Sequence, residues 1–172
     1  MKKQWPYFVL AFAIPILLVL WWWGLFTTAT IEVTTLGPYR YAYLEAQGAY
    51  SKLAGKQHEV MFELQKQGIT PEGSITLILD DPRTTPYDKL VARTGYQIAT
   101  SATPASPLAL ETIPAREVVV AQVRAHPLFA YGKAYSALLD YTRQHGMALR
   151  MPTLERYSNS VLTVEMPVER SP

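Results

Sequence analysis

One order of predicted elements occurs twice in this chain, and this repetition limits the possible folds more than any other feature of the sequence. In the first copy, alternating residues from Tyr39 to Gln47 predict a strand, and apolar residues at helical spacing follow between Gly48 and Gly68. Strand patterns return at Ser74 to Asp81 and at Leu90 to Thr100. The first copy therefore predicts the order strand, helix, strand, strand.

The second copy has the same order. Residues 116–125 predict a strand, Ala130 to His145 predict a helix that ends at Gly146, and residues 152–168 predict a hairpin. One copy alone cannot bury both its helix and its sheet, whereas two copies side by side can. We therefore expect an α+β domain in which two strand-helix-strand-strand pseudo-repeats form one curved, antiparallel-rich sheet. Two helices should back this sheet, and its opposite face should be open.

Before the first copy, a run of apolar residues from Tyr7 to Phe26 predicts a transmembrane helix. It contains no charged residue, and at 1.5 Å per residue its twenty positions span about 30 Å. The tryptophans at 21–23 fit an aromatic belt at a membrane interface. A secretory signal cleaved after Ala29 is the alternative, but the apolar core of a signal is usually shorter. We therefore expect an uncleaved anchor with the lipid bilayer as its partner.

The charges on either side of this segment predict its orientation. Lys2 and Lys3 precede it, and the next basic residue is Arg40. Basic residues favour the cytoplasmic side of a membrane. The N-terminus should therefore lie in the cytoplasm and the domain on the outer side, which in a bacterium is the periplasm.

These patterns divide the chain into parts with different expected roles. The expected parts are a basic N-terminus at 1–6, a transmembrane helix at 7–26, a linker at 27–38, the domain at 39–168 and a tail at 169–172. Within the domain, the first repeat covers about 39–100 and the second 116–168. A proline-rich connector at 101–115 should join them.

The composition excludes several classes of function. Lys2 and Lys3 are two of the 16 basic residues, which leaves 14 against 14 acidic residues in the remainder. A domain without excess positive charge is not expected to bind nucleic acid. The chain has no cysteine, and His58, His126 and His145 lack the spacing of metal ligands. No glycine-rich phosphate loop occurs either, so we expect neither a metal nor a cofactor.

The closing hairpin contains the strongest candidate for a site. Glu155 and Tyr157 are two residues apart on a strand, so they share one face of the sheet. When the two copies are aligned, Leu77 and Leu79 fall at the places of Glu155 and Tyr157. A groove between the repeats would then have an apolar half and a polar half, which is typical of a small-molecule pocket.

Tyr41 and Tyr43 add aromatic side chains to one face of the first strand. A carboxylate among aromatic rings suits a lipophilic cation, because the acid pairs with the charge and the ring faces attract it. The alternative is that Glu155 is an ordinary exposed strand residue, paired with Arg156 or another neighbour.

Several short motifs resemble the GyrI-like small-molecule-binding domain, which is also the effector-binding part of multidrug-responsive transcription regulators. In order along the chain they are QGAY at 47–50, DDP at 80–82, IPAREVVVAQVRAHP at 113–127, ERY at 155–157 and MPV at 166–168. The resemblance covers about residues 39–168. It implies a duplicated strand-helix-strand-strand fold with a ligand pocket between the repeats.

In regulators of this family, a glutamate at the place of Glu155 faces the pocket and pairs with cationic drugs. Other relatives are similar in shape and hydrolyse strained cyclopropane rings with a pocket glutamate and aromatic residues. The resemblance therefore implies a domain that binds a small lipophilic, possibly cationic ligand through Glu155, with Tyr157 beside it. The strand patterns add Tyr41, Tyr43, Leu77 and Leu79 to the candidate site. The alternatives are a hydrolase in which Glu155 and Tyr157 are catalytic, and a protein-interaction module at the membrane.

The sequence departs from the family at Ala125 to Leu128, where a Gly-Pro-Tyr sequence is usual. No DNA-binding domain precedes the module, so we do not expect a direct transcription regulator. A membrane helix before such a domain is similar to the testis-expressed receptor for autophagy of the endoplasmic reticulum, especially at Ile75 to Gly95 and Pro152 to Tyr157. That receptor acts through a long acidic tail that has no counterpart here, so its role is not expected.

Overall fold

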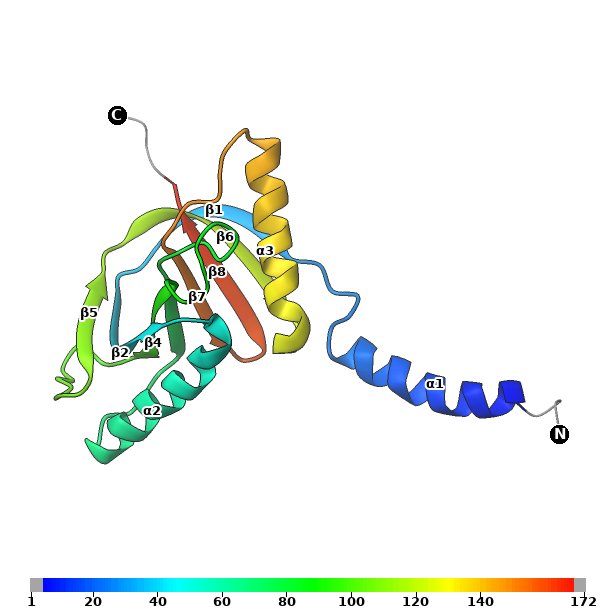
Figure 1. The fold of residues 1–172 in the computed structure, drawn as a ribbon, viewed down its shortest axis with the longest axis horizontal. Helices are drawn as coiled ribbons and strands as arrows, with labels where there is room; N and C mark the ends of the chain where they lie inside the picture. The colour runs from blue at the N-terminus through cyan, green and yellow to red at the C-terminus, as the bar shows by residue number, and fades with distance from the viewer. Residues whose placement is uncertain (1–4, 169–172) are drawn as a thin grey trace.

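The computed structural model describes residues 5–168, and the fold in this range is an antiparallel sheet with helices on one face (Figure 1). The elements in chain order are α1 (Trp5–Trp22), β1 (Thr30–Leu36), β2 (Tyr39–Gln47), the 3-10 turn η1 (Tyr50–Lys52), α2 (Leu53–Lys66), β3 (Ser74–Ile78), β4 (Val91–Gln97), β5 (Ala109–Ile113), β6 (Arg116–Arg124), α3 (Pro127–Gln144), β7 (Thr153–Ser158) and β8 (Val161–Pro167). Lys2, Lys3 and the predicted tail at 169–172 lie outside the described residues.

The predicted pseudo-repeats are confirmed. β2, α2, β3 and β4 form the first, and β6, α3, β7 and β8 form the second. In the described part of the chain, eight strands form one sheet in the order β1-β6-β8-β7-β3-β4-β2-β5, and every neighbouring pair is antiparallel. The repeats meet in the middle, where β3 pairs with β7 and Thr76 lies opposite Glu155.

Two segments that were expected to be connections are strands. Residues 30–36, within the expected linker, form β1 along β6, and residues 109–113, within the expected connector, form β5 along β2. Both segments are short and alternate in character, as half-buried strands do. Each continues the sheet beyond one repeat, so the sheet is two strands wider than the repeats alone predict.

The sheet curls strongly, and the face away from the helices is filled rather than open. β1 and β2 lie near opposite ends of the strand order, yet only Gly37 and Pro38 connect them. Gly37 has φ +101°, and a Cβ there would lie 3.1 Å from the backbone of Ala115. Because the sheet closes on itself in this way, a buried cluster forms inside the curve. It comprises Tyr39, Tyr41, Ile75, Leu77, Ile113 and Leu154.

The helices cover the other face in two separate places, as predicted (Figure 1). α2 packs on its own repeat through Val60 and Leu64, which are fully buried. α3 packs on β6 and β8 through Ala134 and Leu138. Each helix therefore has its own core, and the junction of β3 and β7 lies between them.

The first turn of α3 is fixed by local chemistry. The His126 ring nitrogen Nδ1 accepts a hydrogen bond from the Leu128 amide at 3.3 Å, and Pro127 occupies the first helical turn, where its missing N–H costs nothing. The His126 ring also stacks on Trp23 at 4.5 Å between centroids, and its amide donates to the Trp23 carbonyl at 2.9 Å. The chain entering the domain is thus fastened to the start of α3.

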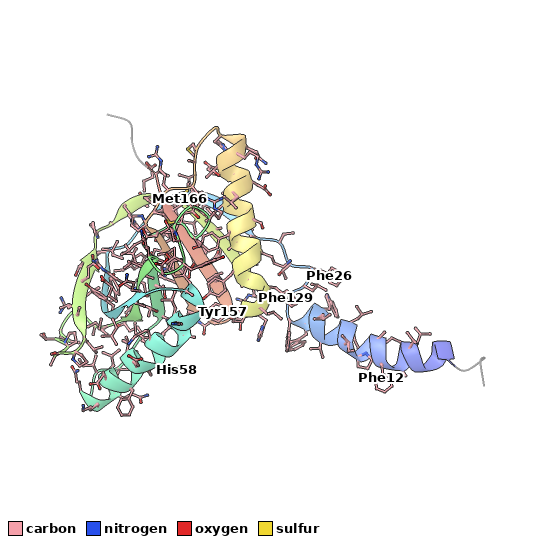
Figure 2. The ribbon with its side chains drawn as sticks, viewed as in Figure 1. Phe12, Phe26, His58, Phe129, Tyr157 and Met166 are labelled. Carbon is pink, nitrogen blue, oxygen red and sulfur yellow. The ribbon has the colours of Figure 1, made fainter. Side chains whose placement is uncertain are left out.

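The predicted transmembrane helix is not supported. α1 ends at Trp22, four residues before Phe26, and contains Pro15. Among the residues that the structure describes, no helix has both the length and the apolar character needed to cross a membrane. α1 extends away from the domain, and Figure 2 shows Phe12 on it, with 72% of its surface exposed.

Candidate functional site

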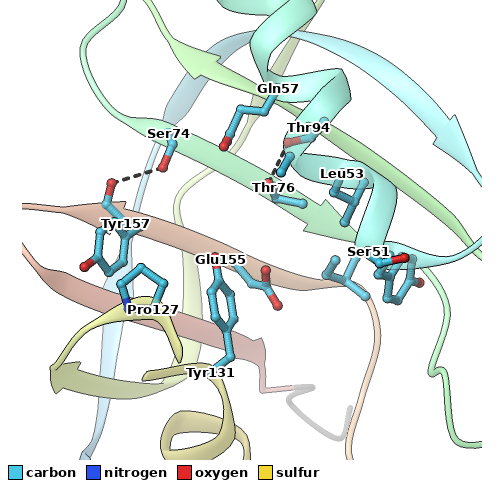
Figure 3. Close-up of a pocket in the computed structure, with 13 residues that line it drawn as sticks. Ser51, Leu53, Gln57, Ser74, Thr76, Thr94, Pro127, Tyr131, Glu155 and Tyr157 are labelled. Carbon is cyan, nitrogen blue, oxygen red and sulfur yellow. Dashed lines mark hydrogen bonds between the residues drawn. The ribbon is translucent and has the colours of Figure 1, made fainter. Parts of the chain in front are cut away.

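A cavity of about 530 Å³ lies on the helical face, where the two repeats meet (Figure 3). One wall comes from η1 and the start of α2, including Tyr50 and Leu53, and the facing wall comes from Pro127 and Tyr131 of α3. The strands β3, β4 and β7 form its floor. A cavity of this size, with walls from both repeats, suits a small organic ligand.

Glu155 is the charged side chain of the cavity. It projects from β7, which has β8 and β3 as neighbours and is not an edge strand. The Tyr135 hydroxyl donates a hydrogen bond to its Oε1 at 2.5 Å. Burial raises the pKa of Glu155 to about 7 from its usual 4.5, and the bond from Tyr135 opposes this rise. In the described part of the chain, no basic side chain pairs with Glu155.

Tyrosines surround this carboxylate from both repeats. Tyr50 reaches it from η1 and Tyr131 from α3, and Tyr157 follows on the same strand, as Figure 3 shows for the last two. Tyr50 donates to the Asp80 carbonyl at 2.6 Å, and Tyr157 donates to the Ala125 carbonyl at 3.3 Å. These bonds fix the hydroxyls and leave the aromatic rings to form the cavity wall.

The floor carries small hydroxyl side chains. Thr76 and Thr94 share a hydrogen bond at 2.8 Å between their hydroxyl oxygens. Ser74 donates to the Tyr157 carbonyl at 3.0 Å. Since these hydroxyls bond to one another or to the backbone, they give the floor a polar surface without charge.

The structure brings together two of the residues predicted for the site. Glu155 and Tyr157 line the same cavity, as their alternation on one strand predicts. Leu77, by contrast, lies opposite Leu154 in the buried cluster on the other face. Leu79 packs against that cluster as well. The alignment of the two repeats, which put Leu77 and Leu79 at the places of Glu155 and Tyr157, therefore does not give a shared groove, because Thr76 and not Leu77 lies beside Glu155 on the cavity face.

Tyr41 and Tyr43 also lie on the other face, away from the cavity. The Tyr41 hydroxyl donates to Glu111 at 2.6 Å, and Arg93 pairs with the same carboxylate at 3.0 Å. Arg93 also lies over the Tyr43 ring, 5.3 Å from its centroid. These tyrosines therefore hold β2, β4 and β5 together and do not contribute to the cavity.

The pairing of Glu155 with Arg156, the alternative interpretation of Glu155, is not found. Arg156 points to the opposite face, where it pairs with the fully buried Glu165 at 2.9 Å. The Tyr39 hydroxyl donates to the same carboxylate at 2.8 Å. Glu165 thus has a charge partner on its face of the sheet, in contrast to Glu155.

Four residues that line the cavities, Tyr50, Thr76, Tyr131 and Tyr135, are not among those predicted for the site. Tyr131 and Tyr135 are four residues apart, so they lie on one side of α3, and this spacing was the available signal. Tyr50 belongs to the QGAY motif, but nothing in its local pattern indicates that its ring reaches the second repeat. Tyr50 comes close to the second repeat only because β3 pairs with β7 in the folded sheet.

We find no group of three or more histidine, aspartate or glutamate side chains arranged to hold a metal ion within residues 5–168. The DDP motif has a structural role instead. Asp80 accepts a hydrogen bond from the Val91 amide at 2.8 Å, and Asp81 forms an ion pair with Arg83 at 2.6 Å. These contacts shape the loop between β3 and β4.

A duplicated α+β sheet with a tyrosine-lined cavity between its repeats defines the class of small-molecule-binding domains. The sequence model of the GyrI-like small molecule binding domain matches residues 29–167. The chain belongs to this GyrI-like family. The match begins just before β1, so the strand that sequence analysis assigned to a linker is part of the family domain.

Solved structures share this fold at low sequence identity. The crystal structure of the EcmrR C-terminal domain has a TM-score of 0.67 and 15% identity, over 83% of this chain and 99% of that one. EcmrR in a DNA complex, solved by cryo-EM, has a TM-score of 0.66 and 15% identity, over 99% of this chain and 69% of that one. SAV2435 bound to tetraphenylphosphonium has a TM-score of 0.57 and 12% identity, over 81% of this chain and 94% of that one. No curated protein sequence matches the chain.

Proposed function

We propose that this domain binds a small lipophilic cation in the cavity between its two repeats. The observation that carries this proposal is Glu155, a carboxylate in the cavity with tyrosines around it and no basic partner among the described residues. A bound cation would supply the missing charge partner. The rings of Tyr50, Tyr131 and Tyr157 would contact its apolar surface and attract its charge.

The electrostatics favour a cation over a neutral ligand. Burial raises the pKa of Glu155 to about 7, which means that the cavity stabilises the carboxylate less well than water does. A cation placed beside the carboxylate would compensate for the hydration that it loses in the cavity, whereas a neutral ligand of the same shape would not. The related structure of SAV2435 contains tetraphenylphosphonium, a lipophilic cation, which supports the same class of ligand here.

Thermal unfolding of the full chain tests this proposal at pH 8, where Glu155 is mostly ionised. We expect tetraphenylphosphonium to raise the melting temperature and neutral triphenylphosphine oxide to have little effect, because a ligand that prefers the folded state stabilises it. Glu155→Gln should remove the effect of the cation. Glu45→Gln, at an exposed carboxylate of β2, is the matched control and should retain it. Equal stabilisation of wild type and Glu155→Gln would contradict the proposal.

A second candidate function is hydrolysis of strained or electrophilic small molecules. The raised pKa of Glu155, about 7, is suited to general acid or base catalysis near neutral pH, and Tyr135 is in hydrogen-bonding contact with the carboxylate. Turnover of an electrophilic substrate with a pH-rate profile that bends near pH 7, and its loss in Glu155→Gln, would establish this activity. Cation binding without turnover would leave binding as the function.

The third alternative is a protein-interaction module at the membrane, for which a solvated Glu155 at the edge of the sheet and no cavity beside it would be expected. β7 is instead an interior strand next to a cavity, so this alternative has less support. The cellular location inferred from Lys2 and Lys3 stays a prediction. Protease protection of the tagged full chain in intact cells would test it.

A further inference from the structure

A second cavity adjoins the first on the other side of Glu155. Its volume is about 240 Å³. Tyr50, Ile78 and Glu155 line both cavities, so these three side chains form a shared wall. The carboxylate of the proposed cation site therefore borders both spaces.

The second cavity is lined mainly by apolar groups. Leu139 of α3 lines it, and Leu149 and Met151 of the following connection and Pro82 of the β3–β4 loop line it as well. Arg83 lies at the same loop, but its guanidinium pairs with Asp81 at 2.6 Å, as described above. Apart from Glu155, the cavity therefore offers a ligand apolar surface and no uncompensated charge.

Two tyrosines on α3 each line one of the two cavities. Tyr131 lines the first cavity, and Tyr135, one turn later, lines the second. Tyr135 also donates to Glu155. Opposite them, Tyr50 is fixed by its bond to the Asp80 carbonyl, so the DDP motif holds the shared wall in place. This arrangement places one charged centre between two separate apolar spaces.

We propose that the second cavity holds an apolar arm of the same ligand, so that the domain selects cations in which one alkyl or aryl arm extends past the charged centre. This inference rests on the proposed function. At about 240 Å³ the cavity is smaller than usual pockets for whole ligands, which occupy roughly 300–1,000 Å³. It is larger than an engineered cavity of about 150 Å³ that binds benzene. An arm, rather than a second whole ligand, is therefore the occupant that fits.

Alkyltrimethylammonium ions of increasing length, from butyl to decyl, test this inference by calorimetric titration of the full chain at pH 8. The positive centre is the same throughout the series, so any gain in affinity reports burial of the chain. We expect the dissociation constant to fall about fourfold for each methylene that enters the cavity, until the cavity is full.

Leu139→Trp should fill the second cavity without touching the first, because Leu139 lines the second cavity alone. In this variant we expect the butyl ion to bind as in wild type and the gain with chain length to disappear. Leu128→Trp is the matched control on the same helix, since Leu128 is 69% exposed and lines neither cavity. If Leu139→Trp fails to fold, Leu139→Ala replaces it. Because this variant enlarges the second cavity, we expect the dissociation constant to keep falling to a longer alkyl chain than in wild type before it levels off.

The outcomes distinguish this inference from the proposed function. If the gain with chain length is the same in Leu139→Trp as in wild type, the arm lies elsewhere, for example on exposed α1, and the inference is overturned. The proposed function stands in that case if binding still depends on Glu155. If neither these ions nor tetraphenylphosphonium binds, the proposed function itself fails and the inference falls with it.

Discussion

Glu155 is the residue at which the requirements of folding conflict with those of the proposed cation binding. Its carboxylate lies in a cavity lined largely by aromatic and aliphatic side chains, and a hydrogen bond from Tyr135 compensates only part of the lost hydration. The direction of its pKa shift shows that the folded state disfavours the charged form. An apolar or neutral residue would be more stable at this position, which is why a ligand-binding role accounts for the glutamate better than a structural role.

This conflict predicts a pH-dependent effect of Glu155→Gln on stability. A carboxyl whose pKa is about 7 when folded and near 4.5 when unfolded stabilises the folded state below pH 4.5, and this contribution is lost as pH rises through 7. The variant should therefore gain stability relative to wild type between pH 5 and pH 8, by about 2 kcal/mol. Urea unfolding at the two pH values measures the gain.

Thr112→Val is a useful companion, because it changes an exposed neutral residue of β5 that lies away from Glu155 and has no titrating group. Its effect on the free energy of unfolding should be the same at both pH values. A Glu155→Gln effect that is equally independent of pH would show that the carboxyl is well hydrated in the folded protein.

Single residues of the site were predictable only as far as strand alternation reaches. The placement of Glu155 beside Tyr157 follows from one strand and was correct. The alignment of the two repeats put Leu77 at the place of Glu155, but neighbouring residues of a strand point to opposite faces, so Leu77 lies on the wrong face and Thr76 lies beside Glu155 instead. The same alternation separates Tyr41 from the cavity.

At the scale of elements, β4 contains a position that accepts only glycine. A Cβ on Gly95 would lie 1.9 Å from the carbonyl oxygen of Ala42 on the paired strand β2. Gly95→Ala should therefore force the two strands apart and lower the free energy of unfolding by roughly 3 kcal/mol or more. Denaturant unfolding measures this loss.

Gly132 supplies the control for that change. It lies in α3, and a Cβ there would meet nothing within 4 Å. Gly132→Ala should raise stability by up to about 1 kcal/mol, because alanine favours a helix more than glycine does. If Gly95→Ala were as well tolerated as Gly132→Ala, the close pairing of β2 and β4 would be incorrect.

The attachment of the N-terminal segment to α3 is also testable. Lys133 donates from Nζ to the carbonyl of Leu25 at 2.8 Å and to that of Thr27 at 2.6 Å. Lys133→Met keeps the length of the side chain and removes both bonds. We expect faster amide hydrogen exchange over residues 23–29, measured by mass spectrometry, with little change in β3 and β7.

Lys66→Met is the control for that measurement, since Lys66 is exposed at the end of α2 and pairs only loosely with Glu63, at 3.7 Å. It should leave exchange in residues 23–29 unchanged. Unchanged exchange in Lys133→Met as well would mean that the stacking of Trp23 on His126 holds the segment without the lysine.

Elements within each repeat were predictable because their patterns are local. The helical spacing of α2 and α3 and the alternation of β2 and β6 appear in the sequence itself. β1 and β5 were missed because each is a strand only by virtue of its partner, and β1 pairs with a strand more than 80 residues away in its register of Thr30 with Gln122. The alternation within each segment is local, but it does not show that a partner strand so far away in the sequence is available for pairing.

At the scale of the whole molecule, duplication creates the site. Each repeat buries its own helix on its own strands, in the core under α2 and the core under α3. Neither core extends across the junction of β3 and β7, so a cavity remains there with walls from both repeats. The curled sheet closes the opposite face with a third core, so the cavity between the repeats lies on the helical face.

The central claim is that a cation binds against Glu155, and the protons released on binding test it most directly. At pH 7 a carboxyl of pKa about 7 is half protonated, and a bound cation would ionise it fully. Titration of the full chain with tetraphenylphosphonium, in buffers of different ionisation enthalpy, should therefore show release of about half a proton at pH 7 and almost none at pH 9. The Glu155→Gln variant should release none. Tight binding without proton release at pH 7, or with the same release in the variant, would contradict the account.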